Sequence, residues 1–535
     1  MELKQEIAKY WAGGDLKPRK AQIEALNWLV ENKHMRYLFV ELPVGGGKSI
    51  CGMTFSRYMN NFSYALTPQI ILQKQYENDF KSDRDLNLAS LYGKANYTCE
   101  EKGGVSCAIG SIGSRCEHCP YAKAREAAQK ANNTVMNYKM ALSSWKFTKI
   151  FKKEDTPVMR NLAICDEGHT FEDHLVSFDA IQITDKWCSD YGLKMPPKKT
   201  RNIRVVVDFI QKSYMQSLVE TYDILLTEIE LMQGNSENER QSTKKTKELK
   251  HVESQLNTCT ELLKMSIDDI EEDYVMVDSP FGIELKRLYG HYSFNNIVKP
   301  IAKQFLFMSS TFLGKAECCA ELGLDPEEVA YISIDSEFDP ENRPVVYMPQ
   351  MKMNFKWNDD ANTKNRDKML DTIKQISAIH EEENGIIHTG NFKIAEWLVE
   401  NLDVDHEIIH HNPGAQLNRN EAIEHFLDSS TTPAILISPS STEGLDLKGD
   451  LGGFAVFAKV PFGNMGDAWV KKRMSISSEW YQRRAMIDMI QGGGRIVRTP
   501  EDEGTTYILD ESFGYLYNQN KKIVPQWWKD AYHEV

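Results

Sequence analysis

The sequence lacks several features that would place a protein in or across a membrane. None of the apolar runs among its 535 residues approaches the ~20 residues that a helix needs to cross a bilayer. The first residues, 1–6, also lack the apolar core of a secretory signal. We therefore expect a cytoplasmic protein with reduced thiols and no membrane partner. The compact chain fits a bacterial or phage origin.

The chain also lacks the excess of basic residues that is typical of proteins coating nucleic acid. Its formal net charge is −14 at pH 7, although only the residues lining a groove would have to be basic to contact phosphates. It has no internal repeat and no extended low-complexity tract. With 41% hydrophobic and 26% charged residues, the composition is that of an ordinary globular protein. The length is too great for a single core and predicts several domains.

What the chain does have is a glycine-rich turn in residues 41–49, which read Glu-Leu-Pro-Val-Gly-Gly-Gly-Lys-Ser. An apolar strand, 37–40, precedes this turn, and a helix can start after it. Backbone N–H groups in such a turn wrap phosphates, while lysine reaches the β/γ-phosphates and serine holds Mg²⁺. Leu42 departs from the usual pattern, which has glycine there, and an ordinary glycine loop is the alternative. The residues expected at the nucleotide are Gly45, Gly46, Gly47, Lys48 and Ser49.

A second segment, 162–169, supplies carboxylates of the kind that a nucleotide site requires. It reads Leu-Ala-Ile-Cys-Asp-Glu-Gly-His, an apolar strand followed by acids. Parallel sheets bind ligands at the carboxyl ends of their strands. We therefore expect Asp166 to hold Mg²⁺ and Glu167 to activate the attacking water.

A third segment, 491–498, reads Gln-Gly-Gly-Gly-Arg-Ile-Val-Arg. Its spacing predicts that Arg495 and Arg498 lie on one face of a helix. Arginines from a second domain can stabilise charge on a transferring γ-phosphoryl group, and Gln491 would lie near the water. The alternative is a surface helix with solvated arginines.

Short β-branched or aromatic runs alternate with helical stretches and predict two tandem α/β domains with parallel sheets. Between them, three- and four-residue apolar spacing over 205–232 and 249–263, interrupted by a polar break, predicts a helical hairpin inserted in the first domain. The expected strands are 38–42, 162–165, 305–308, 385–388, 434–438, 454–458 and 506–509.

Four of the ten cysteines cluster with the spacing C-x7-C-x8-C-x2-C, and a proline follows the last. Four thiolates can bind zinc or a [4Fe–4S] cluster, and the spacing barely separates the two. The proline and the single short C-x2-C pair favour the cluster. The ligands would be Cys99, Cys107, Cys116 and Cys119.

The ordered motifs resemble those of superfamily 2 helicases, and more narrowly the iron–sulfur DNA helicases of the XPD/DinG group. Beyond the segments above, the resemblance is carried by residues 19–22, 67–73, 309–311 and 441–446. Group-specific signatures lie at 93–99, 119–125, 137–138, 338–343 and 459–462. Gly168 stands where the group usually has alanine.

This resemblance implies two RecA-like motor domains with ATP and Mg²⁺ in the cleft between them, a small Fe–S domain carrying a [4Fe–4S] cluster, and a helical arch. It also implies 5′–3′ movement on single-stranded or forked DNA, with replication or repair proteins as partners, and we expect a monomer. The implied domains are 1–95 with 133–172 and 292–345 (first motor), 96–132 (Fe–S domain), 173–291 (arch) and 346–535 (second motor).

Further site residues follow from the same comparison. Arg19 and Gln22 form a Q-motif-like pair at the nucleotide, and Asp446 is expected to bind nucleotide and transmit its state. Hydroxyls at strand ends, and aromatic or basic residues in the cysteine loop, suit a groove that tracks a DNA backbone. The DNA-binding candidates are Thr67, Ser440, Thr442, Tyr97 and Arg125.

Three other functions remain open at this point. A translocase could strip proteins or remodel R-loops without processive unwinding. A nucleotide-gated DNA-binding module would show little turnover, which the presence of Glu167 and both arginines argues against. An RNA helicase would share the Asp-Glu-x-His motif but has no need of the cysteine loop.

Overall fold

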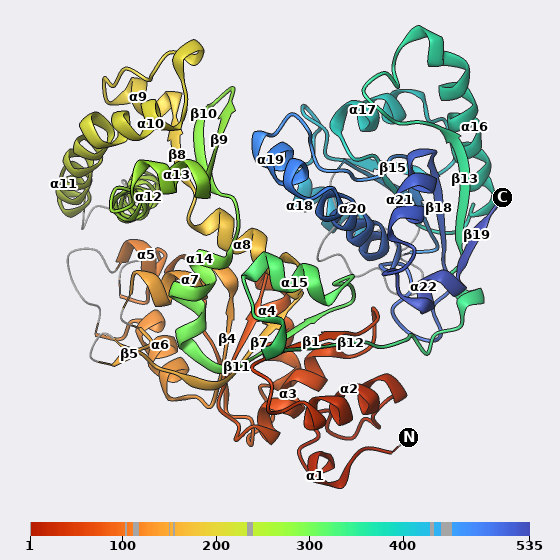
Figure 1. Ribbon diagram of the computed structural model, residues 1–535, viewed down its shortest axis with the longest axis horizontal. Coiled ribbons are helices and arrows are strands. Elements are labelled where there is room, and N and C mark those ends of the chain that lie inside the picture. The colour runs from red at the N-terminus through yellow and green to blue at the C-terminus, as the bar shows by residue number, and fades with distance from the viewer. Residues whose placement is uncertain are drawn as a thin grey trace.

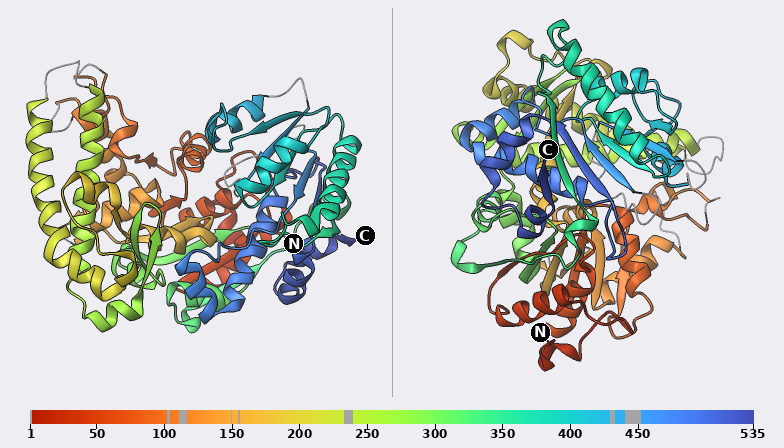
Figure 2. Two further views of the ribbon diagram at one scale, coloured as in Figure 1. Left: turned by 90° about the horizontal axis from the view of Figure 1, so that it is seen from above. Right: turned by 90° about the vertical axis from the view of Figure 1, so that its right-hand side faces the viewer.

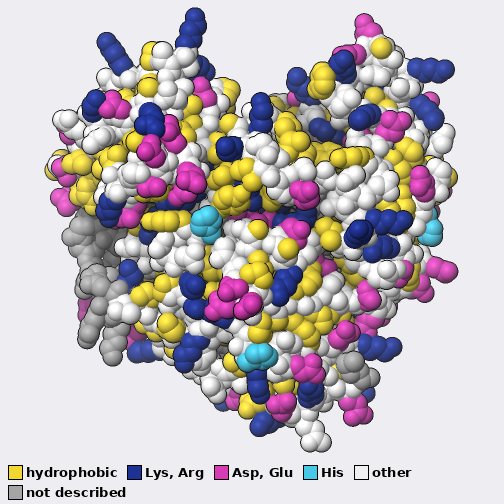
Figure 3. Space-filling view, in the orientation of Figure 1, with side chains coloured by type: hydrophobic (Ala, Val, Ile, Leu, Met, Phe, Trp, Pro, Cys, Tyr) yellow, Lys and Arg dark blue, Asp and Glu magenta, His cyan; other side chains and the backbone are white. Residues whose placement is uncertain are grey.

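The computed structural model folds the chain into two lobes and a helical arch (Figure 1). It describes residues 2–101, 104–110, 117–148, 150–153, 156–232, 239–428, 433–439 and 452–535. From above, the arch and the second lobe stand on opposite sides of the molecule (Figure 2), and a notch separates them in the space-filling view (Figure 3). Among the described residues, no helix is both long and apolar enough to cross a membrane.

Seven parallel strands form the sheet of the first lobe within the described residues, in the order β12-β1-β11-β7-β2-β4-β3. These strands are β1 Tyr37–Glu41, β2 Ser63–Thr67, β3 Leu88–Ser90, β4 Asn133–Asn137, β7 Arg160–Asp166, β11 Ala302–Ser309 and β12 Val329–Ser333. The helices of this lobe are α1 Gln5–Ala8, α2 Lys20–Glu31, α3 Lys48–Tyr58, α4 Ile70–Phe80, α7 Tyr138–Lys146, α8 Phe171–Phe178, α14 His291–Ser293 and α15 Lys315–Leu322.

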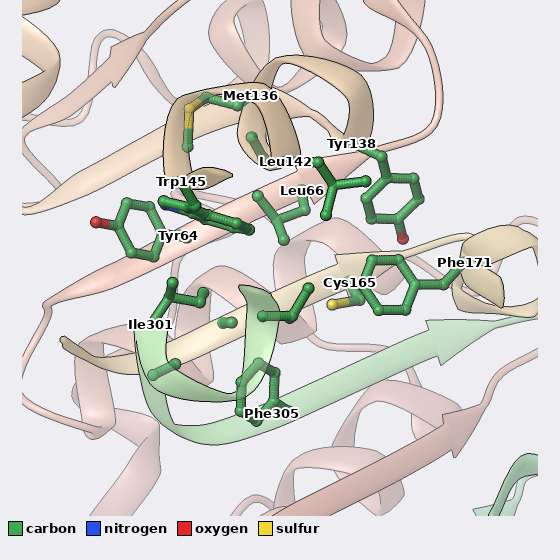
Figure 4. Close-up of a cluster of buried hydrophobic side chains, with 14 of the residues drawn as sticks. Tyr64, Leu66, Met136, Tyr138, Leu142, Trp145, Cys165, Phe171, Ile301 and Phe305 are labelled. Atoms are coloured by element: carbon green, nitrogen blue, oxygen red, sulfur yellow. The ribbon is translucent and has the colours of Figure 1, made fainter. Parts of the chain in front are cut away.

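Apolar side chains cover both faces of this sheet. Figure 4 shows one face, where Leu66 of β2 and Cys165 of β7 lie beneath Leu142 and Trp145 of α7. All four side chains are buried. Burial on both faces explains why these strands read as near-continuous apolar runs in the sequence.

The second lobe repeats this architecture with a sheet of seven described parallel strands, in the order β15-β16-β14-β17-β18-β13-β19. The strands are β13 Val345–Met351, β14 Gly385–His388, β15 Glu407–His410, β16 Ala434–Ser438, β17 Phe454–Phe457, β18 Thr505–Asp510 and β19 Tyr532–Glu534. The helices are α16 Thr363–Ile379, α17 Phe392–Asn401, α18 Arg419–Asp428, α19 Ala468–Ile476, α20 Ser478–Gly493, α21 Ser512–Asn520 and α22 Gln526–Asp530.

The predicted fold class of two tandem parallel-sheet domains is confirmed, and all seven predicted strands are present within three residues of the expected bounds. Because parallel strands end at the same edge of their sheet, the residues that follow β1, β7 and β11 come together. This edge of the first lobe faces the second lobe.

The predicted helical insertion is also present, and it forms the arch together with a three-stranded antiparallel sheet in the order β8-β10-β9. Helices α11 and α12 pack along each other through Leu218, Leu225, Val252 and Cys259. A π-helical segment joins α10 to α11. The arch elements are β8 Ile181–Thr184, α9 Asp185–Asp190, α10 Ile203–Phe209, α11 Met215–Leu231, α12 Glu239–Leu262, α13 Ile267–Asp273, β9 Tyr274–Ser279 and β10 Gly282–Arg287.

The cysteine-rich segment contains α5 (Cys107–Gly110) and α6 (Pro120–Lys130) and lies against the first lobe. Cys99, Cys107 and Tyr121 belong to the same buried cluster as the first lobe's core. Helix α5 also contacts α12 of the arch. The segment therefore packs against both the first lobe and the arch.

Candidate nucleotide site

The glycine-rich turn lies between β1 and α3, as predicted. Gly45 and Gly47 adopt positive φ angles of 73° and 79°, which glycine takes without steric cost. A Cβ atom on Gly45 would lie 2.1 Å from the Arg498 carbonyl oxygen, and one on Gly47 would lie 2.0 Å from Gln22 Nε2. Only glycine therefore fits at either position. Helix α3 begins at Lys48, so its N-terminal N–H groups face this turn and favour an anion.

Arg19 and Gln22 lie against the same turn. Arg19 Nη1 donates a hydrogen bond of 2.7 Å to the Gly45 carbonyl oxygen. The Gln22 side-chain oxygen Oε1 accepts one of 2.9 Å from the Arg19 backbone N–H, which caps the start of α2. The structure thus brings this predicted pair to the glycine turn.

Asp166 and Glu167 follow β7 at the edge of the sheet that the turn occupies. Lys48 Nζ lies 3.3 Å from Glu167 Oε1. Glu167 takes a positive φ of 48°, a strained conformation that points its side chain across the site. Its Oε2 atom is buried without a hydrogen-bond partner in the described part of the chain. This oxygen is available to accept a proton from a water molecule.

The surroundings of the two carboxyl groups shift their pKa values in opposite directions. Burial, and then the adjacent charge of Glu167, raise the pKa of Asp166 to about 6. Burial pushes the pKa of Glu167 upward too, but the charges of Lys48 and Arg495, and of His169 when it is protonated, outweigh this effect and lower it. Glu167 is therefore ionised at neutral pH, as a general base must be. Tyr76 donates a hydrogen bond of 3.1 Å to Asp166 Oδ2.

His169 connects this site to the loop after β11. Its Nδ1 atom lies 2.7 Å from Ser309 Oγ and 3.4 Å from Glu167 Oε2. Burial lowers the pKa of His169 to about 4, so the ring is neutral at pH 7. Ser309 and Thr311 of the loop are fully buried.

The second lobe supplies side chains to the site from the end of α20. Gln491 Nε2 donates a hydrogen bond of 2.7 Å to Thr311 Oγ1. Arg495 lies close enough for its charge to lower the pKa of Glu167. The backbone of Arg498 approaches the glycine turn at Gly45, and its N–H donates a hydrogen bond of 2.7 Å to Asp502. Both lobes therefore meet at the glycine turn.

The prediction that Arg495 and Arg498 share one helix face is wrong, because α20 ends at Gly493. Gly492 lets the helix approach β17, since a Cβ there would lie 2.7 Å from the Phe457 ring. The Gly494 N–H bonds to the Ile490 carbonyl oxygen at 3.0 Å and closes the helix. The two arginines therefore follow the helix in an irregular segment.

Among the predicted ligands of the cysteine-rich segment, Cys107 lies near both Cys99 and Cys119. Cys99 and Cys107 are buried, and Cys119 is half-buried. Burial, and then the nearby thiols of Cys119 and Cys99, raise the pKa of Cys107. Cys116 lies outside the described residues. The described residues alone contain no group of three or more His, Cys, Asp or Glu with the geometry of a metal site.

Basic side chains gather between the arch and the cysteine-rich segment. Burial, and then the charge of Lys94, lower the pKa of Lys250 on α12. Lys94 lies over the Tyr121 ring at 5.6 Å from its centre. Burial, opposed by Glu248 and assisted by Lys139, lowers the pKa of His251. Like charges held close together are suited to bind an anion such as a phosphate backbone.

The other DNA-binding candidates lie in different surroundings. Arg125 is exposed on α6. Tyr97 is half-buried, and its hydroxyl accepts a hydrogen bond of 3.0 Å from the Tyr92 N–H. Thr67 ends β2 as expected but is fully buried, with its hydroxyl bonded to the Gln69 carbonyl oxygen at 3.0 Å. Ser440, Thr442 and Asp446 lie outside the described residues.

Comparison with known families identifies the chain. A helicase C-terminal domain model matches residues 364–531, which lie in the second lobe and its helices. The DEAD_2 family model matches residues 77–187. The chain is an XPD/DinG-like superfamily 2 helicase. It therefore belongs to a class of ATP-hydrolysing enzymes that bind and unwind nucleic acid.

Solved structures share the helicase's fold. The chain is similar to structures titled "XPD_Helicase" (TM-score 0.65, 13% identity) and "XPD_APO" (TM-score 0.62, 13% identity). It is also similar to Xpd4 of S. tokodaii (TM-score 0.56, 14% identity). Each comparison covers 97% of this chain and 100% of the other. No curated protein matches the helicase by sequence.

Several residues beside the acids of the helicase's site could not be assigned to that site from the sequence. Tyr76 and Tyr138 are buried beside the acids, and the Tyr138 hydroxyl donates a hydrogen bond of 2.6 Å to the Asp166 carbonyl oxygen. Arg484 of α20 donates one of 3.2 Å to the His169 carbonyl oxygen. The segment 137–138 was part of the family resemblance, but neither tyrosine was expected at the acids. Tyr76 and Tyr138 are far from Asp166 in the sequence, so no local pattern shows that they contact it.

Proposed function

We propose that this helicase uses ATP to move along single-stranded DNA in the 5′–3′ direction and to unwind duplex or forked DNA during replication, recombination or repair. One observation carries the proposal: Lys48 and Glu167 of the first lobe and Arg495 of the second converge on one glycine-rich turn. Because residues of both lobes form the site, ATP hydrolysis depends on how one lobe is positioned relative to the other.

We assign the following roles to the residues of this site. The amides of Gly45, Gly46 and Gly47, with Lys48, hold the phosphates, and Ser49 and Asp166 hold Mg²⁺, which neutralises the developing phosphate charge when bound. Glu167 takes a proton from the attacking water through its uncommitted Oε2 atom. Gln491, Arg495 and Arg498 complete the site from the second lobe. Arg19 and Gln22 contact the nucleotide from α2.

We assign Cys99, Cys107, Cys116 and Cys119 as ligands of a [4Fe–4S] cluster. The cluster would supply four metal–thiolate bonds that cross-link the segment. The three described thiols already lie together, so the fourth bond would tie residue 116 to the first lobe's core. Anaerobic purification followed by iron, sulfide and zinc analysis tests this assignment. About four irons and four sulfides per chain support it, and one zinc without sulfide contradicts it.

The strand of DNA would pass between the arch and the cysteine-rich segment. Lys94, Lys139 and Lys250 supply positive charge there, and Tyr121 supplies an aromatic face. Contacts with phosphates and ring faces do not depend on base identity, which a motor requires.

Strand separation on forked duplexes tests the proposed activity. Matched substrates carry a single-stranded tail with either a 5′ or a 3′ end, in DNA or in RNA, and Lys48→Ala serves as the inactive control. Unwinding of the 5′-tailed DNA fork, dependent on ATP, supports the proposal. Hydrolysis without strand separation would indicate a translocase that remodels protein–DNA complexes or R-loops, and preference for the 3′ tail or for RNA would contradict the assigned polarity or substrate.

A further inference from the structure

The turn that follows Thr311 carries a leucine from the first lobe into the core of the second. Leu313 is fully buried and belongs to the same apolar cluster as Met486, Met489 and Ile490 of α20. The first lobe otherwise contributes no described residue to this cluster. We call Thr311–Gly314 the Leu313 turn.

The backbone of the Leu313 turn is strained. Leu313 adopts a positive φ of 54°, a region that leucine rarely occupies, and Gly314 has φ of 125°. Such a conformation persists only where surrounding contacts enforce it. A specific partner must therefore hold this turn.

Glu41 is that partner. Its side chain is buried at the end of β1, where the glycine-rich turn begins. Oε2 accepts hydrogen bonds from the Phe312 N–H, from the Leu313 N–H at 2.9 Å and from the Tyr331 hydroxyl at 3.1 Å. Oε1 accepts one of 2.6 Å from Ser333. A buried carboxylate with this many donors fixes its surroundings firmly.

The second lobe holds the same turn from the other side. Arg483 of α20 donates a hydrogen bond of 2.7 Å to the Phe312 carbonyl oxygen and forms a buried ion pair with Glu321 of α15. The two peptide groups on either side of Phe312 are thus held by Glu41 through their N–H groups and by Arg483 through the Phe312 carbonyl group. Two turns further along α20, Gln491 reaches Thr311.

We propose that Glu41 is a positioning residue that couples the two lobes by holding Leu313 in the core of the second lobe. Movement of the glycine-rich turn when nucleotide binds would pass through Glu41 to the Leu313 turn, and from there to α20. This inference rests on the proposed ATP-driven motor, because the coupled movement is the one that hydrolysis would drive.

Two variants test the proposed coupling, one at Glu41 and one at Leu313. Glu41→Gln removes the charge and one acceptor position while keeping the side chain's size, and Leu313→Ala removes the inserted side chain but keeps the backbone. Asp510→Asn is the matched control. Asp510 is a buried carboxylate at the end of β18 that accepts backbone hydrogen bonds from Met353, Val460 and Ser512, and it bonds no residue of the Leu313 turn in the described part of the chain.

The first measurement is hydrogen–deuterium exchange of α20 without nucleotide, which does not depend on catalysis. Glu41→Gln and Leu313→Ala should each raise exchange of the α20 amides at least tenfold, and the double variant should add little, because both act through one contact. Asp510→Asn should leave α20 exchange within twofold of wild type. Unchanged exchange in Glu41→Gln, or fully additive effects, would overturn the proposal.

The second measurement is ATP hydrolysis with single-stranded DNA. Glu41→Gln should lower kcat at least tenfold while KM for ATP and the affinity for a fluorescent ATP analogue stay within twofold, because Lys48 and the turn's amides are intact. An equal loss of nucleotide affinity would mean that Glu41 merely supports the glycine-rich turn and would overturn the proposal. If wild type shows no DNA-stimulated hydrolysis, the proposed function fails while the exchange result still decides the coupling.

Discussion

The two ends of α20 meet the first lobe in different ways. Near its start, Trp480 and Trp469 of the preceding helix α19 form a buried apolar contact with Val176 of α8, and Arg473 of α19 forms a buried ion pair of 2.8 Å with Glu172. At its end, Gln491 makes polar contacts to Thr311 and Ser309, beside the inserted Leu313. An apolar contact is costly to separate, whereas polar groups exchange partners readily when a ligand arrives. The start of α20 is thus suited to be a pivot, and its end to respond to nucleotide.

The largest expected effect on ATP hydrolysis comes from substitutions at the nucleotide site, which the end of α20 contacts. Lys48→Ala and Glu167→Gln should each reduce DNA-stimulated hydrolysis about 1,000-fold or more, because they remove the proposed phosphate ligand and general base. Steady-state phosphate release measures this loss. Lys33→Ala, at an exposed lysine bonded to Tyr58 away from the site, should behave as wild type. Substantial activity in either site variant would remove the assigned role.

Substitutions near the start of α20, the proposed pivot, should instead lower the stability of the protein. Arg473→Met should destabilise the protein by about 3–5 kcal/mol, because it leaves Glu172 buried without its partner. The double variant Arg473→Met with Glu172→Leu should recover most of the loss, since no charge is left buried. Thermal denaturation measures both. A double variant no more stable than the single one would show that the pair is not the reason for the loss.

A smaller effect should appear as a pH dependence of the pivot. Burial, and then the charge of Glu321, raise the pKa of Glu172 to about 7 despite Arg473. Since the folded state holds this proton more tightly than the unfolded state, the stabilisation is complete below the ordinary carboxyl pKa and is lost as pH rises through about 7. Relative to Glu172→Gln, wild type should lose at most about 1.4 kcal/mol per pH unit in this window. A flat difference between pH 5 and 8 would contradict the shifted pKa.

Much of this architecture follows from local sequence patterns. Apolar runs such as 385–388 and 434–438 coincide with β14 and β16, because a strand buried on both faces has to be apolar throughout. The glycine turn and Asp166 could be placed because strand order puts them on one edge of the sheet. These inferences need only short segments and the general rules of parallel sheets.

The remaining features depend on contacts between distant segments. The end of α20 at Gly493 reflects close packing of Gly492 against Phe457, which no local pattern displays. The positive φ of Leu313 depends on Glu41, far away in the sequence. Thr67 was expected at DNA from its position at a strand end, yet neighbouring segments bury it fully. Propensity and spacing cannot predict such contacts, because they arise only once both partners are folded.

The most direct test of a nucleotide site shared by two lobes is ATP hydrolysis by Arg495→Ala in the presence of single-stranded DNA. Arg495 belongs to the second lobe, yet its charge reaches Glu167 of the first. The account predicts that kcat falls about 1,000-fold or more while ATP still binds through the first lobe. A kcat within a few-fold of wild type would contradict it, because the first lobe alone would then be sufficient for hydrolysis.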